Sequence, residues 1–314
     1  MSALVNDLSK LRAVIHNIET VIQGKSSVVE QLLVCLLAEG HLLLEDMPGV
    51  GKTTLVKALA SSISLRFSRI QFTPDLLPQD LLGTNVLNPS DGTFTFHGGP
   101  VFTNLLLADE INRASPRTQS ALLEAMNEQQ VTIDSVSRAL SPPFMVVATQ
   151  NPVEFQGTYP LPEAQLDRFM MRLSVGYPDP ADELQILQER QKEDPLKRLM
   201  PVMRPDDLAQ LQRQVRDVIV SDDVAKYILR LVARTRHAEG VSVGLSPRAS
   251  LALYRAVQAR AFVHERPYVS PEDVQVLFPC CMSHRLVLSS AAQYGGRSVS
   301  HIVSEILEAE TVPV

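Results

Sequence analysis

The sequence predicts an α/β protein in which a parallel sheet, covered by helices on both faces, is followed by a smaller all-helical domain. Short apolar runs alternate with helical stretches up to about residue 178, which is typical of parallel strands that are buried on both sides. Beyond that point the patterns are almost all helical. This alternation ends at a strong breaker of regular structure, Tyr177-Pro178-Asp179-Pro180.

The individual elements follow from local patterns. The candidate strands of the first part are His41–Glu45, Arg69–Phe72, Asn104–Asp109, Phe144–Thr149 and Met170–Val175. In the second part we expect helices to open at Asp206, Ser221, Ser246 and Ser270. The last two are followed by Pro, which suits an N-cap and the first helical position.

Composition indicates an ordinary globular protein of two domains, because the chain has 314 residues, 45% of them hydrophobic and 20% charged. No apolar run approaches the length needed to span a membrane, so we expect no membrane insertion. The first residues lack the basic start, long apolar centre and cleavage site of a secretory signal. We therefore expect a cytoplasmic protein.

Charge and cysteine content narrow the function classes. The chain has 29 Lys and Arg against 35 Asp and Glu, a formal charge of -6. This argues against nonspecific nucleic-acid binding, which depends on a basic surface. The three cysteines, Cys35, Cys280 and Cys281, are too few for a disulfide framework and lack partners at metal-ligand spacing. We expect reduced, buried thiols.

The residues from Asp46 to Thr53 read as a phosphate-binding loop, because they lie between the apolar run 42–44 and the helical stretch 55–60. Free backbone N–H groups and the start of a helix attract an anion, Lys52 neutralises phosphate charge, and the Thr53 hydroxyl is a ligand for Mg²⁺. Asp46 departs from the strict pattern, which has glycine there. The expected binding residues are Pro48, Gly49, Val50, Gly51, Lys52, Thr53 and Thr54.

A buried strand ends in two adjacent carboxylates, Asp109 and Glu110, about 56 residues after the loop. This order fits a nucleotide hydrolase, in which Asp109 holds Mg²⁺ and Glu110 polarises the attacking water as a general base. The alternative is that the two residues only begin a loop.

Two hairpins are expected within the first part, near residues 82–98 and 130–140, because alternating residues flank turn signals there. Phe94 and Phe96 of the first hairpin could either face a partner or pack on the core. His97 is expected to be a polar hairpin residue, because no neighbour completes a metal site.

Together these motifs resemble the MoxR-type AAA+ ATPases over nearly the whole chain. The resemblance is carried by residues 43–54, 108–114, 148–152, 157–169 and 245–249. It implies an AAA+ P-loop αβα core over residues 1–180, a linker over 181–204 and a helical lid over 205–314. An acidic residue at position 46 is similar to a normal variant of this family's loop.

The resemblance also implies roles for residues outside the two motifs. Asn151 would be the first sensor of the γ-phosphate, with Gln150 as the fallback. Arg168 would be an arginine finger that reaches the nucleotide of the next subunit; the alternative is a surface arginine paired with Asp167 or Glu163. Ile22 and Gly24 would contact the base, although Gln23-Gly24-Lys25 departs from the family's usual residues.

Arg248 would be the second sensor, and elementary electrostatics favours this assignment. A cation in the first turn of a helix opposes the helix dipole, so a bound anion would explain its presence. The alternative is a solvated side chain.

The function that the resemblance implies is hydrolysis of ATP with Mg²⁺ by a homo-oligomeric ring, with six subunits as the family expectation. Such a ring would act as a chaperone or remodelling factor on client proteins, together with a partner that carries a von Willebrand factor A (VWA) domain. The alternatives are the ATPase subunit of a metal chelatase and a nucleic-acid motor. The acidic charge balance argues against the motor.

Overall fold

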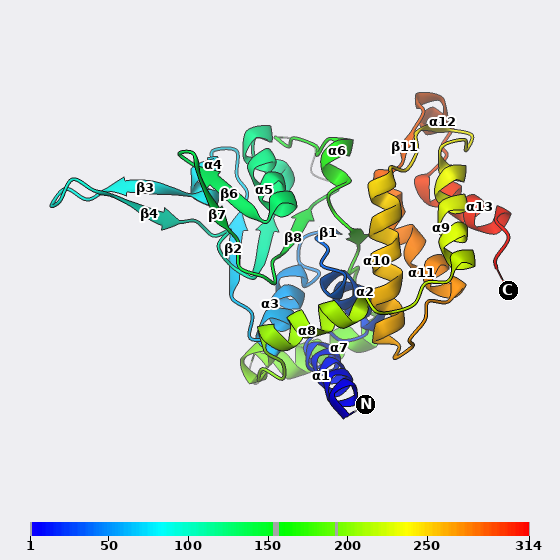
Figure 1. Cartoon of the computed structure of the whole chain (residues 1–314), viewed down its shortest axis with the longest axis horizontal. Coiled ribbons are helices and arrows are strands. Elements are labelled where there is room, and N and C mark those ends of the chain that lie inside the picture. Colours follow the sequence, from blue (N-terminus) through cyan, green and yellow to red (C-terminus); the bar gives the residue numbers. More distant parts are fainter. Residues whose placement is uncertain (1, 153–156, 192–193, 314) are drawn as a thin grey trace. The chain divides into compact units, whose positions relative to one another are not determined.

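The computed structural model describes residues 2–152, 157–191 and 194–313, and the chain forms two compact units (Figure 1). The first unit contains Met1–Val29, His41–Leu161 and Ser174–Ala209, and the second contains Glu30–Gly40, Pro162–Leu173 and Gln210–Val314. The α/β core and the helical second part confirm the predicted fold class. Residues 162–173 lie with the second unit, although they precede the predicted boundary.

The central sheet has five strands in the order β2-β5-β8-β1-β9. Their bounds are β1 (Leu42–Glu45), β2 (Phe67–Gln71), β5 (Leu105–Asp109), β8 (Met145–Gln150) and β9 (Met171–Leu173). The pairs β2–β5, β5–β8 and β8–β1 are parallel. Strands β1, β5 and β8 are buried except at their last residue, as expected for apolar strands covered on both faces.

Strand β2 differs from the sequence prediction of a strand covered on both faces. It lies at the edge of the sheet, begins at Phe67 rather than Arg69, and exposes Arg69 and Gln71 while Ile70 is buried. Residues two apart on a strand share a face. The two polar side chains therefore lie together on one side of β2.

Helices of the first unit surround this sheet. They are α1 (Ser2–Glu19), the start of α2 (Ser26–Leu37), α3 (Lys52–Ser62), α4 (Pro78–Leu82), α5 (Pro116–Glu128), α7 (Pro180–Arg190) and the start of α8 (Pro205–Val215), with the 3-10 turns η1 (Ile111–Arg113) and η2 (Pro195–Arg198). Helix α5 is capped by the hydroxyl of Ser115, which accepts from the Thr118 N–H. Helix α7 lies in the stretch predicted as a linker, and the domain boundaries stay a prediction.

Among the described residues, no helix combines the length and apolar character needed to cross a membrane.

Two antiparallel hairpins lie where the sequence places them. The first, β3 (Gly83–Leu87) and β4 (Phe94–Gly98), extends away from the central sheet in Figure 1. The second is β6 (Gln130–Ile133) and β7 (Val136–Ala139). A 2.6 Å hydrogen bond from Asn85 to Asp134 joins the two hairpins.

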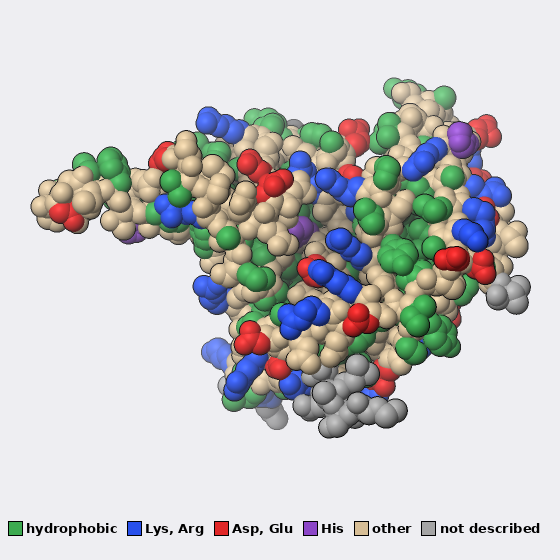
Figure 2. All heavy atoms as spheres, in the orientation of Figure 1, with side chains coloured by type: hydrophobic (Ala, Val, Ile, Leu, Met, Phe, Trp, Pro, Cys, Tyr) green, Lys and Arg blue, Asp and Glu red, His purple; other side chains and the backbone are tan. Residues whose placement is uncertain are grey.

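The structure separates the two phenylalanines of the first hairpin. Phe96 packs edge-on against Phe102 at 5.6 Å between ring centroids and lies under the guanidinium of Arg138. Phe94 is 70% exposed, and hydrophobic side chains are visible along this hairpin in Figure 2. Only Phe96 therefore belongs to a packed cluster.

The second unit is built mainly from helices. They are the end of α2, the end of α8, α6 (Glu163–Leu166), α9 (Asp222–Thr235), α10 (Pro247–Val263), α11 (Pro271–Met282), α12 (Ser290–Tyr294) and α13 (Val299–Ala309), with the turn η3 (Ser283–Arg285). The predicted caps Ser221, Ser246 and Ser270 are present, whereas α8 begins at Pro205, one residue before the predicted Asp206. A short pair of strands, β10 (Val241–Val243) and β11 (Val287–Leu288), is an addition that the sequence did not predict.

All three cysteines are free thiols. Cys35 and Cys281 are buried, as predicted, whereas Cys280 is only half-buried. Burial raises the pKa of both buried thiols, so they are protonated and unreactive at neutral pH. No group of three or more His, Cys, Asp or Glu side chains within the described ranges could hold a metal ion.

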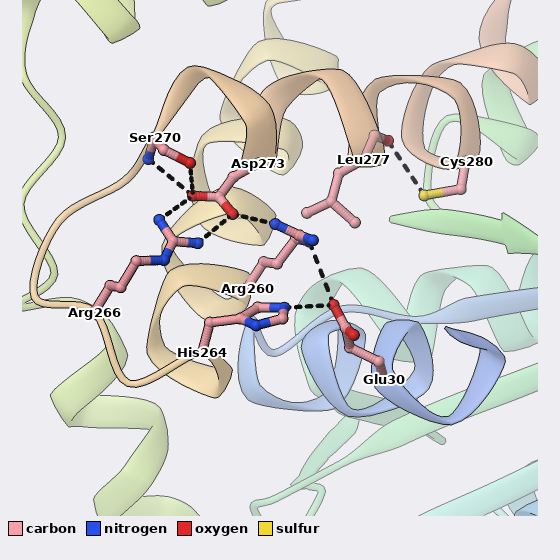
Figure 3. Close-up of polar contacts among 8 residues, drawn as sticks. All are labelled: Glu30, Arg260, His264, Arg266, Ser270, Asp273, Leu277 and Cys280. Carbon is pink, nitrogen blue, oxygen red and sulfur yellow. Dashed lines mark hydrogen bonds and ion pairs between the residues drawn. The ribbon is translucent and has the colours of Figure 1, made fainter. Parts of the chain in front are cut away.

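A buried ion network stabilises the second unit (Figure 3). Asp273 of α11 is fully buried and accepts hydrogen bonds from Arg260 and, at 2.6 and 2.8 Å, from Arg266. It also accepts from the N–H and hydroxyl of Ser270, which closes the N-terminal cap of α11. Arg260 also pairs at 3.3 Å with Glu30 of α2. One carboxylate thus joins α10, α11 and the loop between them.

Replacing Asp273 by Asn is expected to destabilise the protein by about 3–5 kcal/mol, because Arg266 would lose its counter-charge and the buried Arg260 would keep only Glu30. Burial by itself raises the pKa of Asp273, but hydrogen bonds from Arg266, Ser270 and Arg260 outweigh burial and hold the pKa below its usual 3.8. The stabilisation is therefore fully present above pH 3.8 and is lost as the pH falls through the folded-state pKa. Thermal unfolding followed by circular dichroism from pH 7 to 3 measures both effects.

The matched control is Glu272→Gln, which changes an exposed carboxylate in the same helical turn and is expected to alter stability by no more than about 0.5 kcal/mol. Equal stability of the Asp273→Asn variant and the wild type at pH 7 would contradict the assigned role of the network.

Candidate functional site

The phosphate-binding loop connects β1 to α3 and has the backbone that its glycines allow. Gly49 and Gly51 have φ angles of 88° and 95°, in the left-handed region that glycine enters without steric cost. Gly51 is the N-cap of α3 and provides no side-chain cap. The first N–H groups of α3, together with the positive end of its dipole, therefore form a site for an anion.

Lys52, the first residue of α3, folds back over this loop. Its ammonium donates to the carbonyl oxygens of Asp46 at 2.7 Å and Met47 at 3.1 Å. Partial burial lowers the pKa of Lys52, although the nearby carboxylates of Asp46, Asp109 and Glu110 oppose this shift. A phosphate at the loop would replace the two carbonyl groups as a better partner for the cation.

The structure explains the unusual Asp46. Its buried carboxylate accepts from the Ser174 hydroxyl at 2.7 Å and from the backbone N–H groups of Val175 and Gly176. These residues follow β9, so the side chain ties the start of the loop to a neighbouring segment. A glycine at position 46 could not make these bonds.

Asp109 and Glu110 lie at the carboxyl end of β5, and both carboxylates are held in place. Asp109 accepts from the Thr149 hydroxyl at 2.6 Å on one oxygen, and from Nε and Nη2 of Arg69 at 3.1 and 2.7 Å on the other. Glu110 accepts from Gln71 at 2.7 Å and from Arg113 at 2.9 Å. Each carboxylate therefore has a defined position.

Glu110 has a left-handed backbone conformation, with φ 56° and ψ 50°, which is uncommon for a residue other than glycine. Its N–H donates to the Thr149 hydroxyl at 2.9 Å. Strained residues of this kind cluster at functional sites. Here the left-handed conformation of Glu110 ends β5 and directs the chain into the turn η1.

Four residues of this arrangement, Arg69, Gln71, Arg113 and Thr149, were not singled out from the sequence. The pairing of β2 with β5 places Gln71 beside Asp109, and a 3.1 Å hydrogen bond joins Arg69 to Gln71. Arg69 and Gln71 thus link the two carboxylates through one chain of hydrogen bonds. The available signal was the exposed polar alternation of β2, which the apolar reading of that strand overlooked.

One cavity of about 330 Å³ brings the predicted residues of the first unit together. It is lined by Pro48, Gly49, Gly51, Lys52, Thr53, Thr54, Arg69, Asp109, Glu110, Thr149, Gln150 and Asn151. Its volume is typical of small-ligand sites. Asp109 and Thr53 provide carboxylate and hydroxyl oxygens, the ligand class that Mg²⁺ prefers, so the lining fits a nucleotide phosphate chain with its metal.

Three predicted residues of the first unit are not among the described residues that line this cavity: Val50, Ile22 and Gly24. Ile22 is buried, and a Cβ on Gly24 would overlap the Asp182 carboxylate. Gly24 also has a φ angle of 69°, a left-handed conformation that favours glycine. Base contacts by Ile22 and Gly24 stay a prediction.

The remaining two predicted residues belong to the second unit. Arg168 follows α6, and Arg248 lies exposed in the first turn of α10. Both stay candidates for contact with a nucleotide.

The fold and the site define a class of protein, the P-loop nucleotide hydrolases, and comparison with known proteins narrows it. Residues 41–171 match the model of the ATPase family associated with various cellular activities (AAA), and residues 233–306 match the AAA lid domain.

Two relatives match almost the whole chain. The uncharacterized protein YeaC of Bacillus subtilis is 49% identical over 96% of this chain and 94% of its own length. Chaperone MoxR1 of Mycobacterium tuberculosis is 40% identical over 99% of this chain and 84% of its own length. The crystal structure of a candidate ATPase from Cytophaga hutchinsonii superposes with a TM-score of 0.93 at 39% identity, covering 99% of this chain and 97% of that one. The chain belongs to the MoxR family of AAA+ ATPases.

Proposed function

We propose that this AAA+ ATPase binds Mg-ATP in the cavity at the phosphate loop and hydrolyses the γ-phosphate there. The observation that supports this most directly is the convergence of Lys52, Thr53, Asp109, Glu110 and Asn151 on one cavity from three separate parts of the chain. Each carries a group that phosphoryl transfer requires.

Each residue of the cavity has a separate role in binding or hydrolysis. Lys52 and the N–H groups at the start of α3 bind the phosphate oxygens. Thr53 and Asp109 would hold Mg²⁺, which would neutralise charge on the β- and γ-phosphates. Glu110 accepts a proton from the attacking water as the water oxygen bonds to the γ-phosphorus, and Asn151 orients that water. The bond between the γ-phosphorus and the bridging oxygen breaks, and ADP leaves with that electron pair. For Glu110 to reach the water, its bonds to Gln71 and Arg113 must loosen.

We further propose that the active form is a homo-oligomeric ring, with six subunits as the family expectation. Arg168 then acts as an arginine finger on the neighbouring subunit's nucleotide, and Arg248 contacts the γ-phosphate within its own subunit. A cation in the first turn of α10 opposes the helix dipole, and a bound phosphate removes that conflict.

The proposed biological role is an ATP-driven chaperone that remodels client proteins together with a VWA-domain partner. The chaperone role has support from the name of the Mycobacterium tuberculosis relative, and the partner rests on the family resemblance. The exposed first hairpin, with Val86, Leu87 and Phe94 on its surface, offers an apolar surface for a protein client.

The test is the ATPase rate per subunit against protein concentration, with light scattering in ATP, in ADP and without nucleotide. We expect the rate per subunit to rise as ATP-dependent assembly proceeds, because a monomer lacks the neighbour's arginine. Turnover by a monomer that does not change with protein concentration would exclude shared sites, and Arg168 would then be an ordinary surface arginine.

A further inference from the structure

Arg285, in the turn η3 after α11, is a buried cation that the proposed function does not use. Its side chain is 3% exposed. Burial lowers the pKa of this guanidinium, with the Asp167 carboxylate opposing the shift. Within the described part of the chain, its Nη1 atom has no hydrogen-bond partner.

This arrangement is costly for stability alone. A buried ion pair is often no more stable than an apolar side chain of similar volume, and an unpaired buried nitrogen adds a further penalty. Groups that are buried at such a cost are frequently functional. The contacts of Arg285 indicate which function it serves.

Arg285 contacts the residues on both sides of Arg168. Its Nε lies 3.5 Å from the Asp167 carboxylate, and its Nη2 donates to the Phe169 carbonyl at 2.8 Å. The neighbouring His284 also bonds the Phe169 carbonyl, at 2.9 Å. Burial lowers the pKa of His284 to about 3, so this imidazole is neutral and its Nε2 donates. The turn η3 thereby holds the backbone carbonyl after Arg168 and the side chain before it.

Asp167 makes a second connection, to the helix that carries Arg248. The hydroxyl of Ser246, the N-cap of α10, lies 3.2 and 3.4 Å from the two Asp167 oxygens. Ser246 precedes Arg248 by two residues. All of these groups, including the segment Pro162–Leu173, belong to the second unit.

We propose that Arg285 is a positioning residue for the arginine finger Arg168. It holds the Asp167 carboxylate beside Ser246 and thereby connects the Arg168 segment to the start of α10. Binding of ATP to Arg248 in one subunit then determines the position of the arginine finger that acts on the next subunit. This inference rests on the proposed function, because it requires Arg168 to act in trans.

The experiment uses complementation between full-length subunits that are each inactive. A Glu110→Gln subunit keeps its finger but lacks the base, and an Arg168→Ala subunit keeps the base but lacks the finger. Mixing them restores hydrolysis if fingers act in trans. Arg285→Met is then placed in one subunit or the other, and the rate, ATP affinity and ring assembly are measured for each mixture.

The Glu110→Gln subunit supplies the arginine finger and is called the donor. Adding Arg285→Met to the donor is expected to lower the restored rate of hydrolysis by about 10²-fold, the loss that a displacement of Arg168 by about 1 Å can cause. In the Arg168→Ala subunit, which lacks a finger, the same change is expected to alter the rate by no more than about twofold. ATP affinity and assembly stay unchanged in both mixtures. This asymmetry separates positioning of the finger from a general effect on folding.

Equal rates with and without Arg285→Met in the donor would overturn the proposal, and so would equal losses in both placements. If the parent pair fails to restore hydrolysis, the finger in trans is wrong and the inference falls with it. If Arg285→Met does not fold, Asp167→Asn replaces it, because this change removes the carboxylate that Arg285 and Ser246 contact. The same asymmetric loss is expected, and its absence would overturn the proposal.

Discussion

Replacing Glu110 by Gln is expected to lower ATP turnover by about 10²- to 10⁴-fold, the range that a general base contributes. The amide keeps the shape of the side chain and can still accept from Gln71 and Arg113, which hold the carboxylate in the structure. Lys52 and Asp109 are untouched, so ATP affinity is expected to stay at the wild-type value. Steady-state hydrolysis and binding of a fluorescent ATP analogue measure the two quantities separately.

The control for this prediction is Glu128→Gln, the same chemical change at the exposed last residue of α5. Its turnover is expected to match the wild type. A Glu110→Gln protein that hydrolyses ATP at the normal rate would remove Glu110 from the mechanism. Loss of ATP affinity would instead show that the carboxylate supports the binding site rather than the chemical step.

Replacing Arg168 by Ala is expected to cost about 10³- to 10⁵-fold in turnover, the contribution of an arginine finger to the transition state. The variant subunit keeps every residue of its own cavity and should bind ATP normally. In an equal mixture with Glu110→Gln subunits, random assembly gives about one quarter of the heterologous interfaces a base on one side and a finger on the other. Hydrolysis should recover to about that fraction of the wild-type rate.

Arg213→Ala, at an exposed arginine of α8, is the matched control and should leave turnover unchanged. Wild-type activity of Arg168→Ala alone would show that the residue is an ordinary surface arginine. An inactive variant that the Glu110→Gln subunit cannot rescue would place the action of Arg168 within its own subunit.

The parts of this fold that the sequence predicts well are those that depend on local interactions. The Ser246 hydroxyl accepts from the Ala249 N–H, and the N–H and hydroxyl of Ser270 donate to the Asp273 carboxylate. Each bond joins residues three apart, and Pro at the next position favours the same helix start. The hairpins near 82–98 and 130–140 follow from alternation around a turn. Strand β2 was predicted less well, because it was interpreted as an apolar strand and the alternation of Arg69 and Gln71, which marks one polar face, was overlooked.

The candidate site was predictable only in part for the same reason. The loop at Lys52 and the pair Asp109 and Glu110 have sequence signatures, because phosphate and metal binding require particular residues at fixed spacing. Arg69 and Gln71 have no such signature. Their role arises from the register that pairs Gln71 with Asp109, and register depends on packing across the whole sheet.

The sequence by itself determined the chemistry of this protein: a phosphate loop, two carboxylates after a buried strand, and a family pattern that extends into the helical part. Only the tertiary structure decided how those groups are held, since each supporting contact joins residues far apart in the chain. Asp46 binds the backbone after β9, Arg69 pairs with Asp109, and Arg285 fixes the residues around Arg168. Such contacts leave no local pattern, because the chain must fold before the partners meet.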